Sequence, residues 1–119
     1  MIKVYTPHLF NHVQKLFESW GIHIHETDLP QLGFVNDNAA CFLVTTDTKA
    51  CLIEFLISRK GCDTRDKDLD EVVNSCLTLA QYLGFKKVIA VTAIQKVIDR
   101  AEKHGFEKKN LTHYLVKEI

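Results

Sequence analysis

CLIEFLIS, residues 51–58, is the stretch from which the fold of this chain can be worked out. Its apolar residues are typical of a buried β-strand, yet Glu54 stands in the middle of the run. A buried carboxylate must pair with a cation, reach water or take up a proton, because an unpaired buried charge is costly. The stretch therefore predicts either a structural ion pair or a reactive carboxylate in a partly desolvated cleft.

Alternation along this strand predicts which side chains share a face. Glu54 should lie on one face together with Leu52 and Leu56. The opposite face should carry the remaining apolar side chains, which are Ile53, Phe55 and Ile57.

Turn formers divide the surrounding sequence into short elements. Two turns, 36–38 and 47–49, connect three apolar runs and predict an antiparallel meander. The strongest helical stripe follows the last of these runs and ends at Gly84. The expected strands are 2–5, 31–35, 41–46, 50–59, 86–92 and 112–117, and the expected helices are 6–21, 66–84 and 97–105.

This order, β-α-β-β-β-α-β-α-β, predicts an α/β (α+β) fold with a mixed sheet in one domain, residues 1–119. Strands 50–59 and 86–92 should be parallel neighbours joined by a right-handed crossover, and should diverge near 57–59. The loop SRKGCDTRDK, residues 58–67, then lies at the carboxyl end of its strand, where α/β proteins usually bind ligands. The N-terminus of the next helix would offer N–H groups to an anion there.

Composition narrows the classes of function. The chain has 119 residues, 46% hydrophobic and 25% charged, with 15 Lys and Arg against 15 Asp and Glu. A net charge of zero argues against a general nucleic-acid-binding protein. We expect a cytoplasmic protein without a membrane anchor, because no apolar run approaches the ~20 residues of a membrane span and MIKVYTPHLF lacks a signal-peptide core.

The cysteines and histidines give weak signals. No C-x-x-C pair occurs, and three cysteines in apolar patterns are expected to be buried free thiols: Cys41, Cys51 and Cys76. Cys62 lies in the polar loop near Lys60 and Arg65, as either a plain exposed thiol or a reactive one. His8 and His12 are four residues apart on the first helix and His23 and His25 two apart, but no Glu intervenes as in H-E-x-x-H and no Cys lies nearby at a ligand spacing, so no metal site is predicted.

Four segments resemble the GCN5-related N-acetyltransferases (GNAT), particularly the short, divergent versions often encoded by phages. They are GFVNDNAACFLVTT (33–46), ACLIEFLISRKG (50–61), AQYLGFKKVIAVT (80–92) and IQKVIDRAEKHGFEKKNLTHYLVKEI (94–119). The Ala-x-x-x-Gly-Phe spacing from Ala101 to Phe106 is the most family-like piece. A phage-encoded protein of this kind would act in the host cytoplasm.

The resemblance implies acetyl-coenzyme A bound between strands 50–59 and 86–92, with a coenzyme A thioester and an unknown amine or protein acceptor as partners. Glu54 would be the general base. The family holds the pyrophosphate with an Arg/Gln-x-x-Gly-x-Gly/Ala loop, of which this chain keeps Arg59 and only one glycine. The residues implied to bind the cofactor are Ile57, Ser58, Arg59, Lys60, Gly61 and Arg65.

Other family positions are altered. The general-acid Tyr position is Ala101, and an Asn position before it is Ile94. Acidic residues at the helix start would repel an anion, which leaves a capped helix with a solvated charge cluster as the alternative to an anion-binding loop: Asp63, Asp66 and Asp68. Two functions remain open, an acyl-CoA-dependent N-acetyltransferase and a non-catalytic GNAT-fold module that binds or inhibits a host or virion protein.

Overall fold

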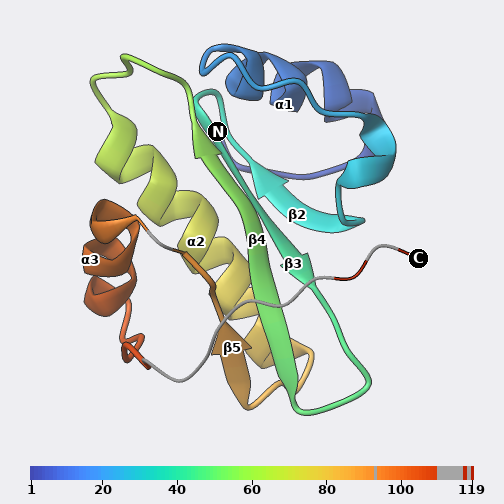
Figure 1. The fold of residues 1–119 in the computed structure, drawn as a ribbon, viewed down its shortest axis with the longest axis vertical. Helices are drawn as coiled ribbons and strands as arrows, with labels where there is room; N and C mark the ends of the chain where they lie inside the picture. Colours follow the sequence, from blue (N-terminus) through green and yellow to red (C-terminus); the bar gives the residue numbers. More distant parts are fainter. Residues whose placement is uncertain (93, 110–116, 118) are drawn as a thin grey trace.

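The computed structural model describes residues 1–92, 94–109, 117 and 119 (Figure 1). The strand predicted at 112–117 therefore falls almost entirely outside the described residues. The elements appear in the predicted order: β1 (Lys3–Val4), η1 (Pro7–Leu9), α1 (Phe10–Glu18), η2 (Glu26–Asp28), β2 (Leu32–Val35), β3 (Ala39–Val44), β4 (Ala50–Ser58), α2 (Arg65–Tyr82), β5 (Lys87–Ile89) and α3 (Gln95–Lys103).

The described strands form one mixed sheet in the order β1-β2-β3-β4-β5. The pairs from β1 to β4 are antiparallel, and β4 and β5 are parallel, which confirms both the meander and the crossover. Pairing between β4 and β5 covers only Ala50–Leu52 and Lys87–Ile89. The two strands therefore separate earlier than the predicted point at 57–59, and β5 lies beside only the lower part of β4 in Figure 1.

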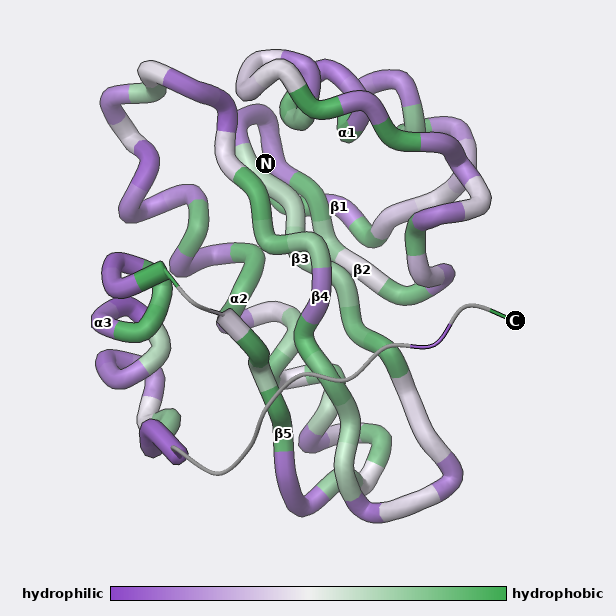
Figure 2. Tube along the Cα trace, in the orientation of Figure 1, coloured by the Kyte–Doolittle hydropathy of each residue, from purple (hydrophilic) through white to green (hydrophobic). Residues whose placement is uncertain are grey.

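Helices cover both faces of the sheet, and each covers its own apolar cluster. Val13, Leu16 and Phe17 of α1 pack with Phe42 of β3 on one face, here called the α1 face. On the opposite face, the α2 face, the buried side of α2 packs against the sheet through Leu69, Val72, Val73 and Cys76, together with Ala39 and Cys41. The strands are accordingly hydrophobic along their length, but β4 carries a hydrophilic segment near its middle, where Glu54 is its one charged residue (Figure 2).

A β-bulge in β4 changes the predicted faces. Ala40 pairs with Ile57 and Phe42 with Glu54, so Cys41 alone opposes two residues of β4. Phe55, one of those two, has φ +53°, which is rare for an aromatic residue and is characteristic of such a bulge.

The alternation beyond Glu54 was therefore predicted wrongly, because one extra residue shifts every later side chain to the other face. Leu56 packs with Ile53 on the α2 face rather than with Glu54. Phe55 and Ile57 pack on the α1 face. Glu54 lies on that face too, because it is directly opposite Phe42.

The strand predicted at 86–92 is shorter than expected and is not buried. It spans Lys87–Ile89, and Val91, predicted to lie in a buried strand, is 76% exposed. The physical reason is that the β4–β5 ladder ends at the pair Leu52–Ile89, so residues 90–92 do not pair with β4.

Residues 80–85 have the same Ala-x-x-x-Gly-Phe spacing as residues 101–106, and both segments end a helix in the same way. Gly84 and Gly105 both have φ +89°, a left-handed conformation that glycine adopts without strain. The N–H group of the following Phe then donates to the carbonyl of the Ala five residues earlier, at 3.1 Å in each case. The spacing from Ala101 to Phe106 thus has a local cause as a helix C-cap.

Gly33 of β2 allows a close approach within the sheet. A Cβ at this position would lie 2.5 Å from Cδ1 of Phe42 and 2.9 Å from the carbonyl oxygen of Cys41. The Phe42 ring therefore lies across β2 and meets the ring of Tyr5 edge to face, with centroids 5.0 Å apart. No described helix is both long and apolar enough to cross a membrane.

Candidate functional site

The loop between β4 and α2, residues 59–64, gathers most of the predicted cofactor-binding residues. Arg59, Lys60 and Gly61 lie in it, and Arg65 is the first residue of α2. It leaves the carboxyl end of β4, near the point where ligands bind in parallel sheets (Figure 1). Because β5 stops pairing at Leu52, the edge of β4 that leads to this loop has no described strand beside it.

The backbone of this loop offers several hydrogen-bond donors. Among the described residues, no acceptor is found for the N–H groups of residues 61, 63 and 64, nor for those of 65–67 in the first turn of α2. Gly61 has φ +77° and no described atom within 4 Å of the position a Cβ would take. A set of N–H groups beside Lys60 and Arg65 is chemically suited to a phosphate or another anion.

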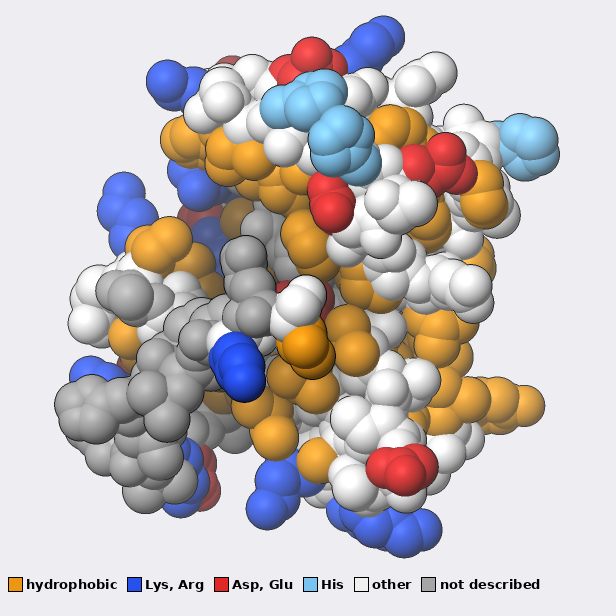
Figure 3. All heavy atoms as spheres, turned by 45° about the vertical axis from the view of Figure 1, so that its right-hand side comes forward, with side chains coloured by type: hydrophobic (Ala, Val, Ile, Leu, Met, Phe, Trp, Pro, Cys, Tyr) orange, Lys and Arg blue, Asp and Glu red, His pale blue; other side chains and the backbone are white. Residues whose placement is uncertain are grey.

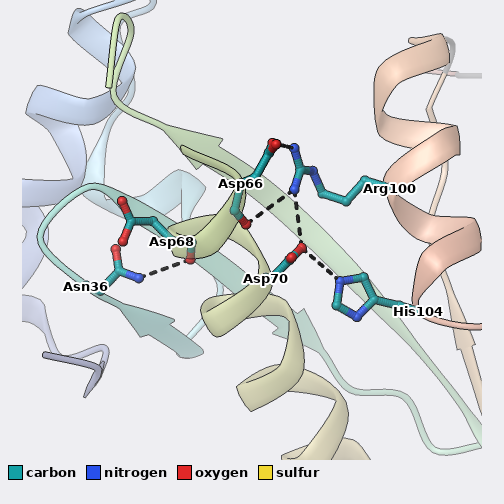
Figure 4. Close-up of polar contacts among 6 residues, drawn as sticks. All are labelled: Asn36, Asp66, Asp68, Asp70, Arg100 and His104. Atoms are coloured by element: carbon teal, nitrogen blue, oxygen red, sulfur yellow. Dashed lines mark hydrogen bonds and ion pairs between the residues drawn. The ribbon is translucent and has the colours of Figure 1, made fainter. Parts of the chain in front are cut away.

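The β2–β3 turn holds one side of the loop. The carbonyl oxygen of Asn38 accepts a hydrogen bond from the N–H group of Arg59 at 2.8 Å, and its Oδ1 accepts one from the Arg59 guanidinium at 2.5 Å. Asn36 is 4% exposed and donates to the carbonyl of Asp68 at 3.0 Å (Figure 4) and to the Glu71 carboxylate at 2.8 Å. The sequence identified these asparagines only as turn formers, and the Arg59 side chain is directed to the turn.

The C-terminal end of α1 holds the other side. The Trp20 indole N–H donates to the carbonyl oxygen of Ser58 at 2.5 Å, and Ser19 Oγ accepts from the N–H group of Lys60 at 3.0 Å. Lys60 Nζ and the Arg65 guanidinium lie 5.6 and 5.2 Å from the centroid of the indole ring. Sequence analysis missed Ser19 and Trp20, since Trp20 fits the apolar stripe of the first helix and nothing local distinguishes it.

Two of the three carboxylates expected to oppose an anion are engaged. The Asp66 carboxylate pairs with Arg100 of α3 at 2.6 Å, and this hydrogen-bonded cation lowers the pKa of Asp66. Arg100 also contacts Asp70 at 3.2 Å, where His104 Nε2 lies 3.1 Å away (Figure 4). The network fastens α3 to the first turns of α2 and partly neutralises the helix start.

Asp68 is held by neutral donors. The Thr64 hydroxyl donates to its carboxylate at 2.5 Å and the Asn38 amide at 3.0 Å. These hydrogen bonds, that of Thr64 first, lower the pKa of Asp68 despite the opposing effect of burial. Asp63 is exposed in the loop.

Glu54 is exposed, although the sequence pattern around it is that of a buried strand. No hydrogen bond or ion pair joins its carboxylate to any other residue within 1–92, 94–109, 117 and 119. Its neighbour across the sheet is Phe42, and it lies on the α1 face next to the bulge. The sequence left two hypotheses for Glu54, a buried ion pair and a carboxylate in a partly open cleft. Within the described residues Glu54 forms no ion pair, and its carboxylate faces solvent.

The two predicted cofactor residues at the end of β4 differ in their surroundings. Ile57 is half-buried and packs against the apolar cluster of the α1 face. Ser58 is 3% exposed, and its Oγ is a buried polar atom with no hydrogen-bond partner among the described residues. Such an atom is unusual in a native structure, since buried polar atoms are normally hydrogen-bonded.

The general-acid position lacks an acid. Ala101 lies half-buried in α3, and its carbonyl oxygen caps the helix through Phe106. Ile94, which takes the family's Asn position, is 62% exposed directly before α3. Two tyrosines elsewhere in the sequence are alternative acids: Tyr114 lies outside the described residues, and Tyr82 is 85% exposed near the far end of α2.

The cysteines follow the sequence prediction. Cys41, Cys51 and Cys76 are buried free thiols, whereas Cys62 is half-buried in the loop. Burial raises the pKa of the Cys51 thiol, and the hydrogen bond with Cys76 together with burial raises that of Cys41. Cys62 Sγ lies 3.3 Å from the Thr64 hydroxyl.

Histidines and carboxylates gather on the side of the sheet that carries Glu54. The segment between α1 and β2 packs on the α1 face through Ile24 and Leu29 and exposes four such side chains: His23, His25, Glu26 and Asp28. Figure 3 shows histidine and acidic side chains over the upper part of this side of the molecule. In the described part of the chain, no three His, Cys, Asp or Glu side chains are grouped closely enough to hold a metal ion.

A hollow in the surface lies away from the loop. It is a shallow depression of about 470 Å³ on the C-terminal half of α2, lined by Phe34, Asn74, Ser75, Thr78, Leu79 and Tyr82. No carboxylate or cation is among these lining residues.

Comparisons with known proteins give a clear result for the fold. No protein-family model matches the chain, and no curated protein sequence matches it significantly. Among solved structures, a protein from Agrobacterium tumefaciens str. C58 described as an acetyltransferase matches with a TM-score of 0.76 at 16% identity, covering 99% of each chain.

Two further structures agree. An aminoglycoside acetyltransferase from an uncultured soil metagenomic sample, in complex with sisomicin, matches with a TM-score of 0.72 at 14% identity, over 99% of this chain and 96% of that one. A GNAT-family acetyltransferase from Streptococcus pneumoniae TIGR4 matches with a TM-score of 0.69 at 13% identity, over 99% and 100%. The chain has the GNAT acetyltransferase fold.

Proposed function

We propose that this chain binds acetyl-coenzyme A at the β4–α2 loop and transfers the acetyl group to an amine. The observation that carries the proposal is the loop itself, a run of N–H groups without described acceptors. It is flanked by two cations and lies at the end of a strand edge that has no partner among the described residues. The fold supports the same function, because the neighbours include acetyltransferases over nearly their whole length. At 12–16% identity it does not define a substrate.

The residues present fit a pyrophosphate. The N–H groups of residues 61 and 63–67 would face its oxygens, and Lys60 and Arg65 would supply positive charge. Arg100 offsets the charge of Asp66 at the same helix start. Gly61 alone replaces the family's glycines, but its surroundings leave room for close approach.

The remainder of the coenzyme would follow the edge of β4. Between Ile53 and Ser58 this edge has no described strand partner on the side of β5. An edge of this kind presents backbone N–H and C=O groups to an extended ligand, as in strand addition. The edge leads from the loop toward Glu54, which supports the carboxylate as the reactive group.

Acetyl-coenzyme A supplies an activated thioester, so that a carbon–nitrogen bond to the amine forms as the carbon–sulfur bond breaks. Glu54 would accept the proton that the amine nitrogen loses, either directly or through one water molecule. The exposed carboxylate near an open strand edge is suited to this role, because no described cation competes for it. With Ala101 at the general-acid position, solvent would protonate the departing thiolate.

The acceptor amine would approach over the α1 face. Glu54 lies on this face, and the exposed Glu26 and Asp28 belong to the segment that packs there. Carboxylates around an acceptor site favour a cationic substrate, which an amine is at neutral pH. We therefore expect small cationic amines to be better acceptors than anionic ones.

Calorimetric titration with acetyl-coenzyme A tests the proposal before an acceptor is known. Binding should be saturable, should weaken with salt, and should fall about tenfold or more when Lys60 and Arg65 are both replaced by Ala. Lys49→Ala is the matched control, since Lys49 is exposed in the turn at the opposite end of β4. Loss of binding in the control but not in the loop variant would overturn the proposed site.

The second candidate is a non-catalytic module of the same fold that binds or inhibits a protein partner. The observation that favours this candidate is that Ala101 stands where the family has its general-acid Tyr. Absence of any acetyl-coenzyme A binding at millimolar concentration would support this alternative. A phage origin, and with it a host or virion partner, stays a prediction.

A further inference from the structure

We propose that Trp20 is a positioning residue of the β4–α2 loop, which holds Lys60 and Arg65 ready for an anionic ligand. The inference rests on the proposed function of this loop and adds a residue that the family resemblance does not supply. Trp20 is the only tryptophan of the chain and is 36% exposed, directly after α1. Its side chain contacts the loop in two separate ways.

The first contact fixes the backbone at the start of the loop. The indole N–H donates to the carbonyl oxygen of Ser58 at 2.5 Å, and the neighbouring Ser19 Oγ accepts from the N–H group of Lys60 at 3.0 Å. The two bonds hold the last residue of β4 and the second residue of the loop against the C-terminal end of α1. They leave the N–H groups of residues 61, 63 and 64 without a described acceptor.

The second contact concerns the side chains. Lys60 Nζ lies 5.6 Å and the Arg65 guanidinium 5.2 Å from the centroid of the indole ring, within the range of a cation–π interaction. Long basic side chains at a surface normally sample many rotamers, and ordering them costs entropy when a ligand binds. The ring reduces this cost, because it gathers both cations beside the free N–H groups.

An anion should bind the two cations while they stay beside the ring. Their N–H groups can donate charge-assisted hydrogen bonds to phosphate oxygens without leaving the indole, and the bound negative charge changes the electronic environment of the ring. Because Trp20 is the only tryptophan, fluorescence reports this binding without interference from another indole.

Trp20 lies between the expected cofactor loop and the α1 face, over which the acceptor is expected to approach. α1 packs on the face that carries Glu54, while its last residues contact the loop at the carboxyl end of β4. A ligand held by Lys60 and Arg65 therefore lies at the end of the helix that covers the expected acceptor side.

The test compares wild type with Trp20→Leu and Trp20→Phe, using acetyl-coenzyme A and inorganic pyrophosphate as probes. Trp20→Leu removes the ring and should raise the Kd for both probes about 5- to 20-fold. Trp20→Phe keeps an aromatic face but loses the N–H donor, and should restore part of the affinity. Tyr82→Leu, an exposed aromatic residue near the far end of α2, is the matched control and should leave both Kd values unchanged.

Fluorescence gives the readout that a purely structural role would not move. In wild type, each probe should change the Trp20 emission with the same Kd as calorimetry gives, and the change should vanish when Lys60 and Arg65 are both Ala. Unaltered affinity in folded Trp20→Leu, or emission that does not respond to a bound probe, would overturn the inference while leaving the proposed function intact.

Other outcomes are equally decisive. If wild type binds pyrophosphate with an emission change but does not bind acetyl-coenzyme A, the inference stands and the proposed transferase fails. If neither probe binds, both fail. Should Trp20→Leu not fold, as judged by circular dichroism, the Trp20→Phe variant and the emission of the Lys60 and Arg65 variant still decide.

Discussion

Glu54→Gln distinguishes a reactive carboxylate from a structural one, because Gln keeps the shape of the side chain but removes its charge and its ability to accept a proton. Glu54 is exposed, its cross-strand neighbour is Phe42, and no described residue forms an ion pair with it. The loss of about 3–5 kcal/mol expected when one partner of a buried ion pair is removed should therefore not occur.

The expected change in the free energy of unfolding is at most about 0.5 kcal/mol, the usual range for a surface substitution. For a domain of this size that corresponds to a shift in Tm of about 2–3 °C or less. If Glu54 is the general base, turnover with a reactive amine should fall ~10²–10⁴-fold, equivalent to about 2.7–5.5 kcal/mol in the activation free energy. Binding of acetyl-coenzyme A should be unaffected.

Urea unfolding and a thiol-release assay with a panel of cationic amines measure the two effects. Glu102→Gln provides the matched control, since Glu102 is an exposed carboxylate on α3 whose side chain forms no hydrogen bond or ion pair with another described residue. A loss of stability above about 2 kcal/mol would show that Glu54 is structurally paired after all. Unchanged turnover in a folded variant would remove Glu54 from the mechanism.

Three further outcomes are expected. Gly33→Ala should lower the free energy of unfolding by about 1–3 kcal/mol, because its Cβ would lie 2.5 Å from Cδ1 of Phe42; Phe42→Leu in the same chain should recover part of the loss, and undiminished stability in urea would contradict this packing. Alkylation at mildly alkaline pH should modify Cys62 before the three buried thiols, and acetyl-coenzyme A should slow it; mass spectrometry that finds a buried thiol labelled first would be inconsistent with the structure. Arg100→Ala should raise the pKa of Asp66 toward its ordinary value of 3.8. A lowered pKa in the folded state stabilises the protein at pH values above the unfolded-state pKa, and this stabilisation is lost as the pH falls through the folded-state pKa. The variant should therefore be less stable than the parent at neutral pH and equally stable in acid, and a difference that persists in acid would exclude the ion pair as its cause.

Local patterns predicted the elements and their order. The turn formers at 36–38 and 47–49 produce the antiparallel meander, and the apolar stripe before Gly84 produces α2. These signals depend on residues within a few positions of one another, so they can be recognised without knowledge of any tertiary contact. The parallel pairing of β4 with β5 was predicted from the strand–helix–strand order, which forms a crossover between parallel neighbours.

Local sequence patterns did not predict the β-bulge in β4. The sequence around Phe55 contains no glycine, and its left-handed φ is imposed by the pairing of β4 with β3. As a result, the faces of Phe55, Leu56 and Ile57 were predicted wrongly. Glu54, in a run that looks buried, is exposed. Periodicity assumes a regular strand, and one extra residue cancels it.

The sequence by itself determined the meander, the crossover and the position of a basic loop with a single glycine at the end of β4. Only the tertiary structure decided what surrounds that loop: Trp20 contacts Ser58 from 38 residues away, and Arg100 reaches Asp66 across 34 residues. Contacts at such separations leave no periodic trace, because each depends on where two independently formed elements come to lie in space. The candidate site is built mainly from contacts of this kind, which is why the sequence located the loop but not the residues that hold it.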